Sequence, residues 1–180
     1  MPRYVAFLRA INVGGHVVKM DDLRRRFAQL GFTKVETFIA SGNVIFSSPS
    51  RGAAALEKKI ERQLEKSFGY EVKAFVRTLA EVADVAARQP FDDSRVKTAG
   101  AYCVGFLAAR LPPAAAKSVL ALKNGEDDFH VAGREVYWIS TKRQGEAVFS
   151  NALLEKTLKM RSTFRGVRTV QKLAAKYPPE

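Results

Sequence analysis

The sequence predicts an α+β fold of two ferredoxin-like (split βαβ) units in tandem, with antiparallel sheets that carry their helices on one face. Residues 3–77 read as strand, helix, strand, strand, helix, strand, which is the order of a split βαβ unit. Residues 101–177 repeat this order less regularly. A polar segment at 92–100 separates the two halves, so we place the units at 1–90 and 91–180.

The spacing of apolar residues predicts each element of the first unit. Apolar residues at steps of three and four mark helices, and short apolar or alternating runs mark strands. Asp21 or Asp22 is the expected N-cap of the first helix, because a short carboxylate accepts hydrogen bonds from free first-turn amides. Glu57 and Glu61 are expected to face outward from the second helix. The expected strands are 4–8, 35–40, 44–46 and 71–77, and the expected helices are 21–30, 53–68 and 79–88.

The second half follows the same plan with weaker signals. The expected strands are 101–107, 129–132, 135–140 and a brief 162–165, and the expected helices are 112–123, 150–159 and 169–177. The brief last strand makes this second unit imperfect, and the unit ends in basic helices. The first strand of each unit is apolar on both sides, so the second face of each sheet is expected to be covered by the other unit or by a partner chain. The sequence therefore leaves open whether the protein forms a homo-oligomer.

Composition limits the class of protein. The formal net charge of +12 attracts polyanions but does not determine a fold. The single cysteine, Cys103, excludes an internal disulfide framework, and its apolar neighbours favour a buried, inert thiol. No apolar run approaches the roughly 20 residues of a membrane helix, and the first residues do not resemble a signal peptide. We therefore expect a cytoplasmic protein with no membrane partner.

Two glycine-bearing turns of the first unit form a candidate ligand site. In a split βαβ unit the first and third strands are antiparallel neighbours, so the turn after one meets the turn before the other. Backbone amides of a glycine-rich turn before a helix bind anions, and a nearby arginine adds a charged donor. The alternative interpretation is purely structural, with an asparagine tying loop to strand. The predicted residues for a small anionic or phosphate-bearing ligand are Arg9, Asn12, Gly14, Gly15, Ser41, Gly42 and Asn43.

A basic segment supports a second hypothesis. Residues 156–176 contain seven basic residues and no acidic one. Such a segment contacts nucleic-acid phosphates without reading sequence, although a charge run is also typical of a solvated helix face. The alternating Gly and Phe pattern of an RNA-reading strand is missing. The predicted polyanion-binding residues are Lys159, Arg161, Arg165, Arg168 and Lys172.

No motif identifies a reaction. His16 and His130 are the only histidines, and neither HExxH nor CxxC spacing accompanies them, so we expect no metal site. Neither a Walker loop nor GxGxxG occurs, and we expect no cofactor. Catalytic residues stay unassigned, and the sequence leaves open whether the protein is an enzyme.

Several of these stretches resemble one family. YVAFLRAINVGG and TFIASGNVIF are similar to the signature of a bacterial family known as domain of unknown function 1697, in which YVALLRGINVGG and SGNVVF are typical. Ala10 stands where glycine is usual. The Pro90-Phe91 pair and TVQKL at 169–173 also match, whereas residues 166–168 depart from the family's C-terminal Arg-Asn motif. The resemblance implies ferredoxin-like units and no known activity.

Overall fold

The chain divides into two compact units. The computed structural model describes residues 1–12, 15–39 and 42–180. The first unit comprises Met1–Ala83 together with Leu173–Glu180, and the second comprises Asp84–Lys172. No helix in the described part of the chain is long and apolar enough to cross a membrane.

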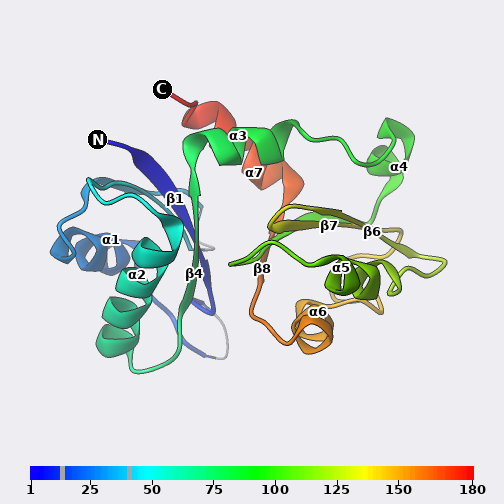
Figure 1. The fold of residues 1–180 in the computed structure, drawn as a ribbon, viewed down its shortest axis with the longest axis horizontal. Coiled ribbons are helices and arrows are strands. Elements are labelled where there is room, and N and C mark those ends of the chain that lie inside the picture. Colours follow the sequence, from blue (N-terminus) through cyan, green and yellow to red (C-terminus); the bar gives the residue numbers. More distant parts are fainter. Residues whose placement is uncertain (13–14, 40–41) are drawn as a thin grey trace. The chain divides into compact units, whose positions relative to one another are not determined.

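The first unit contains a four-stranded antiparallel sheet (Figure 1). Its elements are β1 (Arg3–Arg9), α1 (Met20–Gln29), β2 (Thr33–Thr37), β3 (Asn43–Ser47), α2 (Ala53–Phe68), β4 (Lys73–Thr78) and the start of α3 (Leu79–Ala87). The strand order is β2-β3-β1-β4, and every neighbouring pair is antiparallel. This is the order of a split βαβ unit, as predicted.

Helices α1 and α2 cover one face of this sheet. Tyr4, Ala6 and Leu8 of β1 point toward the helices and share a core with Phe27 of α1 and Ile60 of α2. The intervening β1 side chains point to the opposite face, because successive residues of a strand alternate between faces. Those side chains are buried as well: Val5 and Phe7 are 0% and 1% exposed. The second face is therefore covered, as the apolar character of β1 predicts.

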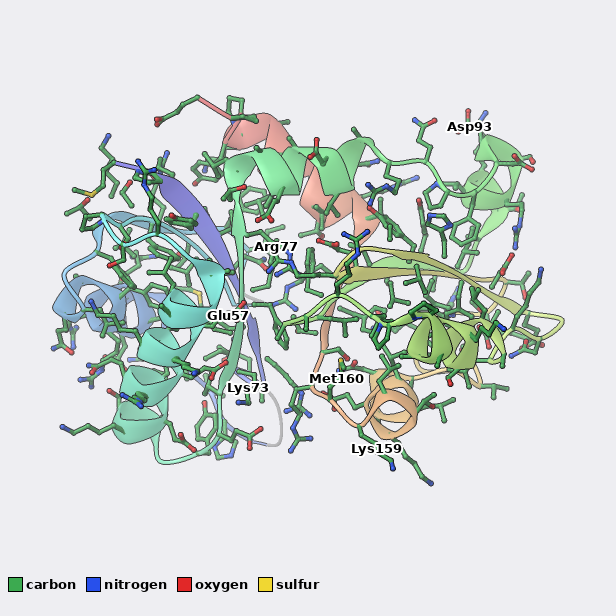
Figure 2. All side chains as sticks on the ribbon, in the orientation of Figure 1. Glu57, Lys73, Arg77, Asp93, Lys159 and Met160 are labelled. Carbon is green, nitrogen blue, oxygen red and sulfur yellow. The ribbon has the colours of Figure 1, made fainter. Side chains whose placement is uncertain are left out.

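Carboxylates from α2 close the open edge of this sheet. β4 is the last strand, so its outer amides have no neighbouring strand. Glu57 accepts a hydrogen bond from the Val76 amide at 2.9 Å, and Glu61 accepts one from the Ala74 amide at 3.1 Å. Figure 2 shows Glu57 between α2 and β4. The expectation that these two glutamates face outward is wrong, because a strand edge packed under a helix needs acceptors for its amides.

The C-terminal residues are held on β2. The Tyr177 hydroxyl donates to Glu36 Oε2 at 2.5 Å. Arg3 pairs with the same carboxylate at 3.5 Å, and its guanidinium lies 5.4 Å from the centre of the Tyr177 ring. Burial and the contact with Glu36 raise the pKa of Tyr177 to about 12. These contacts account for the assignment of the last eight residues, Leu173–Glu180, to the first unit.

The second unit is a complete repeat of the same plan. Its elements are α4 (Asp93–Thr98), β5 (Ala101–Phe106), α5 (Pro113–Leu120), β6 (Asp127–Ala132), β7 (Glu135–Ser140), α6 (Asn151–Leu158), β8 (Thr163–Gly166) and the start of α7 (Val167–Lys176). The strand order is β6-β7-β5-β8, again antiparallel throughout. The brief last strand pairs along β5 from Cys103–Gly166 to Phe106–Thr163. The polar segment expected to be a linker contains α4.

The core of the second unit includes one buried polar cluster. Cys103, Trp138 and Leu154 belong to an apolar core between the sheet and its helices. Within it the fully buried Asp127 carboxylate accepts from Trp138 Nε1 at 3.0 Å and from Asn124 Nδ2 at 2.9 Å. These hydrogen bonds outweigh the effect of burial and lower the pKa of Asp127. The carboxylate therefore serves to fix β6 against β7.

Removing the Glu57 side chain should destabilise the edge of the first sheet. Glu57→Ala leaves the Val76 amide without this acceptor, and we expect a loss of about 1–3 kcal/mol in the free energy of unfolding. The Val76 amide should also lose protection against hydrogen exchange. Glu65→Ala, on the exposed side of the same helix, should change stability by less than about 0.5 kcal/mol. Equal losses in the two variants, measured by denaturant unfolding, would contradict the edge-capping role.

Candidate functional site

The two predicted turns meet where β1 ends and β3 begins. Phe7 pairs with Asn43 across the two strands, and the Leu8 amide donates to the Gly42 carbonyl at 2.9 Å. Gly42 has a φ of +85°, and a Cβ atom there would lie 3.2 Å from the Leu8 Cβ and 3.5 Å from the Ile11 Cβ. A glycine is therefore needed for this close approach. Because β1 and β3 are antiparallel, both turns lie at the same end of these two central strands, which forms one edge of the unit.

Arg9 and Lys73 bring two cations to the same edge. Arg9 is the last residue of β1 and is paired in register with Lys73, the first residue of β4. Paired residues of neighbouring strands point to the same face. The Lys73 ammonium lies 3.5 Å from Glu61. Sequence reasoning missed Lys73, because only the strand register brings it beside Arg9.

Each asparagine of the predicted site stabilises its own turn. Asn12 Oδ1 accepts from the Val18 amide at 3.0 Å, across the loop that follows β1. Asn43 is buried, and its Nδ2 donates to the Phe38 carbonyl at 2.8 Å. These contacts agree with the structural interpretation of the turns, so ligand binding by these side chains stays a prediction. Of the other predicted residues, Gly14 and Ser41 lie outside the described part of the chain.

Two residues without the freedom of glycine adopt left-handed backbone beside these turns. Ala10, directly after β1, has a φ of +69°, and Ile39, shortly before Gly42, has a φ of +60°. This region is unfavourable for an L-residue and most of all for a β-branched one. Ile39 is also 52% exposed, so burial does not compensate it. Such strain is concentrated at ligand-binding sites.

A hollow lies beside the first turn, at the start of α1. It has a volume of about 490 Å³ and is lined by Val17, Val18, Lys19, Asp21, Asp22, Arg25 and Phe68. The expectation that Asp21 or Asp22 caps this helix is wrong, because α1 begins at Met20 and its N-cap is Lys19. Asp21 pairs with Arg24, and Asp22 pairs with Arg25 at 3.4 Å. Two carboxylates in the first turn oppose the binding of an anion in this hollow.

His16 closes the other side of the first turn. Its ring stacks on Tyr70, with centroids 3.9 Å apart, and the Tyr70 hydroxyl donates to the Ile11 carbonyl at 3.3 Å. The stack ties the loop to the end of α2. Gly15 next to it has a φ of +83° and open space around its Cα. Within the described ranges, no three or more His, Cys, Asp or Glu residues are grouped to hold a metal ion.

The basic residues near the C-terminus lie at two ends of one strand. Lys159 and Arg161 precede β8, whereas Arg168 and Lys172 follow it on α7. A strand of four residues spans about 13 Å, and Figures 1 and 2 show α6 with Lys159 at one end of β8 and α7 at the other. All four side chains are exposed. They form two separate pairs, and their binding to a polyanion stays a prediction.

Arg165, the fifth basic residue of that hypothesis, is buried. It is 7% exposed, and its Nη1 donates to Thr163 Oγ1 at 2.8 Å and to the Phe164 carbonyl at 2.9 Å. Burial lowers the pKa of this guanidinium to about 10. Because its guanidinium is buried, Arg165 is poorly placed to contact a phosphate chain.

The comparisons with known proteins identify a family and a fold. The model of a family described as a protein of unknown function (DUF1697) matches residues 1–137. The solved structure of the conserved bacterial protein SP0830 from Streptococcus pneumoniae is similar over 98% of this chain and 98% of that chain, with a TM-score of 0.73 and 24% identity. At that identity the likeness shows the fold alone. No curated protein matches this chain significantly.

Replacing Ala10 by glycine should stabilise the protein. Glycine removes the left-handed strain at this position, and we expect a gain of about 1 kcal/mol in the free energy of unfolding, or a rise of about 2–4 °C in Tm. Ala28→Gly, at an exposed position inside α1, should instead cost about 1 kcal/mol. Thermal unfolding of both variants measures whether each substitution raises or lowers Tm. A loss of stability in Ala10→Gly would show that the backbone here is not strained.

The Cys103 thiol should be unreactive in the folded protein. It is 5% exposed, and burial raises its pKa to about 11, so the nucleophilic thiolate is scarce at neutral pH. A thiol-specific chromogenic disulfide should react with it only in denaturant. Rapid labelling of the native protein would contradict its position in the core.

Proposed function

Because the chain belongs to the DUF1697 family of proteins of unknown function, we propose a function from its geometry: the edge that includes Arg9, the turn at 12–15 and the turn at 41–43 binds a small anionic or phosphate-bearing ligand. The observation that carries the proposal is the meeting of the two turns, fixed by the hydrogen bond from the Leu8 amide to the Gly42 carbonyl. Gly42 also lies against Ile11, the residue before the turn at 12–15, and this closeness supports a ligand shared by the two turns.

The cations favour an anion over a neutral ligand. Arg9 presents a planar guanidinium whose donors match the two oxygens of a carboxylate or phosphate. Lys73 stands beside it in register, although its ammonium is also paired with Glu61. The formal charge of +12 raises the local concentration of anions further. The carboxylates of Asp21 and Asp22 in the first turn of α1 repel an anion, which favours Arg9 as its partner.

The strained residues support a binding role for this edge. Ala10 and Ile39 each have a left-handed backbone conformation, which lowers the stability of the folded protein. Backbone that is already held in this conformation at Ala10 and Ile39 reduces the conformational entropy lost on binding. The ligand is expected to be small, because the turns are short. The proposal concerns binding and assigns no reaction.

The proposal predicts ligand-dependent stabilisation that requires Arg9. A panel of nucleotides, sugar phosphates and carboxylic acids is screened by thermal unfolding. A ligand present at about 100 times its Kd should add about 2.7 kcal/mol of stability. Arg9→Gln should abolish this shift, since it removes the charge and leaves a shorter, neutral polar side chain.

Arg51→Gln is the matched control. Arg51 is exposed and lies in the connection after β3, at the end of the sheet where Arg3 pairs with Ser47. It removes the same charge from the opposite end of the unit, so the ligand shift should persist. If no compound stabilises the wild-type protein, or if both variants lose the shift equally, the edge is not an anion site.

A further inference from the structure

The outer face of α2 carries an unusual set of cations. Lys58, Lys59, Arg62 and Lys66 are exposed and border a groove of about 470 Å³ between this helix and Leu30 at the end of α1. Two of the three glutamates of α2, Glu57 and Glu61, are turned toward the β4 amides, so the exposed Glu65 alone remains beside the four cations. The demand of the sheet edge for acceptors therefore leaves the outer face positive.

Three of these cations form a regular row. Lys58, Arg62 and Lys66 follow one another at steps of four residues, so they lie on one side of the helix about 6 Å apart, over about 12 Å in total. Among the described residues, none of the three takes part in an ion pair. By contrast, Arg24 and Arg25 of α1 are paired with Asp21 and Asp22.

The groove has charge but few groups that read a sequence. Gln63, the one amide in its lining, donates to Gln29 Oε1 at 3.1 Å. The nearby Phe32 ring is buried beneath Lys59, whose ammonium lies 5.2 Å from the ring centre, so it offers no platform for stacking a base. The remaining lining is Leu30 and Ala55. Such a surface suits a uniform, regularly charged partner.

We propose that this face of α2 binds the sugar-phosphate backbone of double-stranded nucleic acid without reading its sequence. Each strand of a duplex carries one phosphate per about 3.4 Å of axis, so the row faces about three to four phosphates. The positive charge of the whole chain steers the duplex toward it. The site shares no residue with the proposed anion edge or with the basic set around β8, and the inference does not depend on the proposed function.

The test is the salt dependence of duplex binding. Fluorescence anisotropy of a labelled duplex of random sequence is measured with the full chain between about 50 and 200 mM salt. Four phosphate contacts predict a slope of log K against log salt of about −3.6. The triple variant Lys58→Gln, Arg62→Gln, Lys66→Gln should weaken binding and flatten this slope by about 3. Glutamine is a good helix former at exposed positions, so circular dichroism should show an intact fold.

A second triple variant separates this site from general charge. Lys159→Gln, Arg161→Gln, Arg168→Gln removes the same three charges from exposed positions around β8. It should retain a nearly unchanged slope. If both variants bind duplex equally weakly, the net charge of the protein explains the binding. If the second variant alone binds more weakly, the segment around β8 is the binding site. Either of these two results would overturn the proposal. Failure of the wild-type protein to bind duplex, or tighter binding of an acidic polypeptide at α2, would overturn it as well.

Discussion

The central position of β1 in its sheet is the constraint on which the first unit depends. β1 is hydrogen-bonded to β3 on one side and to β4 on the other, and both of its faces are buried. Its register can hardly shift, since a slip of one residue would exchange its two sets of side chains. The pairing with β3 brings Gly42 to Leu8, and the pairing with β4 places Lys73 beside Arg9. The candidate site is thus a consequence of how β1 is held.

The contact between α2 and β4 decides the charge of the opposite surface. An unsatisfied buried amide costs about 1–3 kcal/mol, whereas an exposed ion pair contributes about 0–1 kcal/mol. Glu57 and Glu61 are therefore more useful as acceptors for Val76 and Ala74 than as partners for the lysines of their own helix. A structural requirement of the sheet edge has an electrostatic effect on the far side of the helix.

The sequence predicted most of the architecture but few of the individual side-chain roles. The order of elements follows from the spacing of apolar residues along the chain. This pattern is strong in α2 and weak but still recognisable in β8. The roles of Glu57 and Glu61 could not be predicted. The helical spacing of apolar residues places charged residues on the solvent side and contains no information about a neighbouring strand edge. The same limit applies to Arg165, whose burial depends on tertiary packing. The convergence of the turns was predictable, because it follows from topology alone.

The strained residues distinguish the two proposed surfaces. The row on α2 lies on a regular helix whose positions satisfy ordinary helix chemistry, so its charges are added to a stable element at little cost. The edge near Arg9 instead holds Ala10 and Ile39 in backbone conformations that cost about 1–2 kcal/mol each. Glycine at Ala10 would remove that cost, and the exposed Ile39 gains little from burial. Lys34 and Lys159 also have left-handed backbone, so the argument for a ligand rests on the position of Ala10 and Ile39, which both flank the two turns.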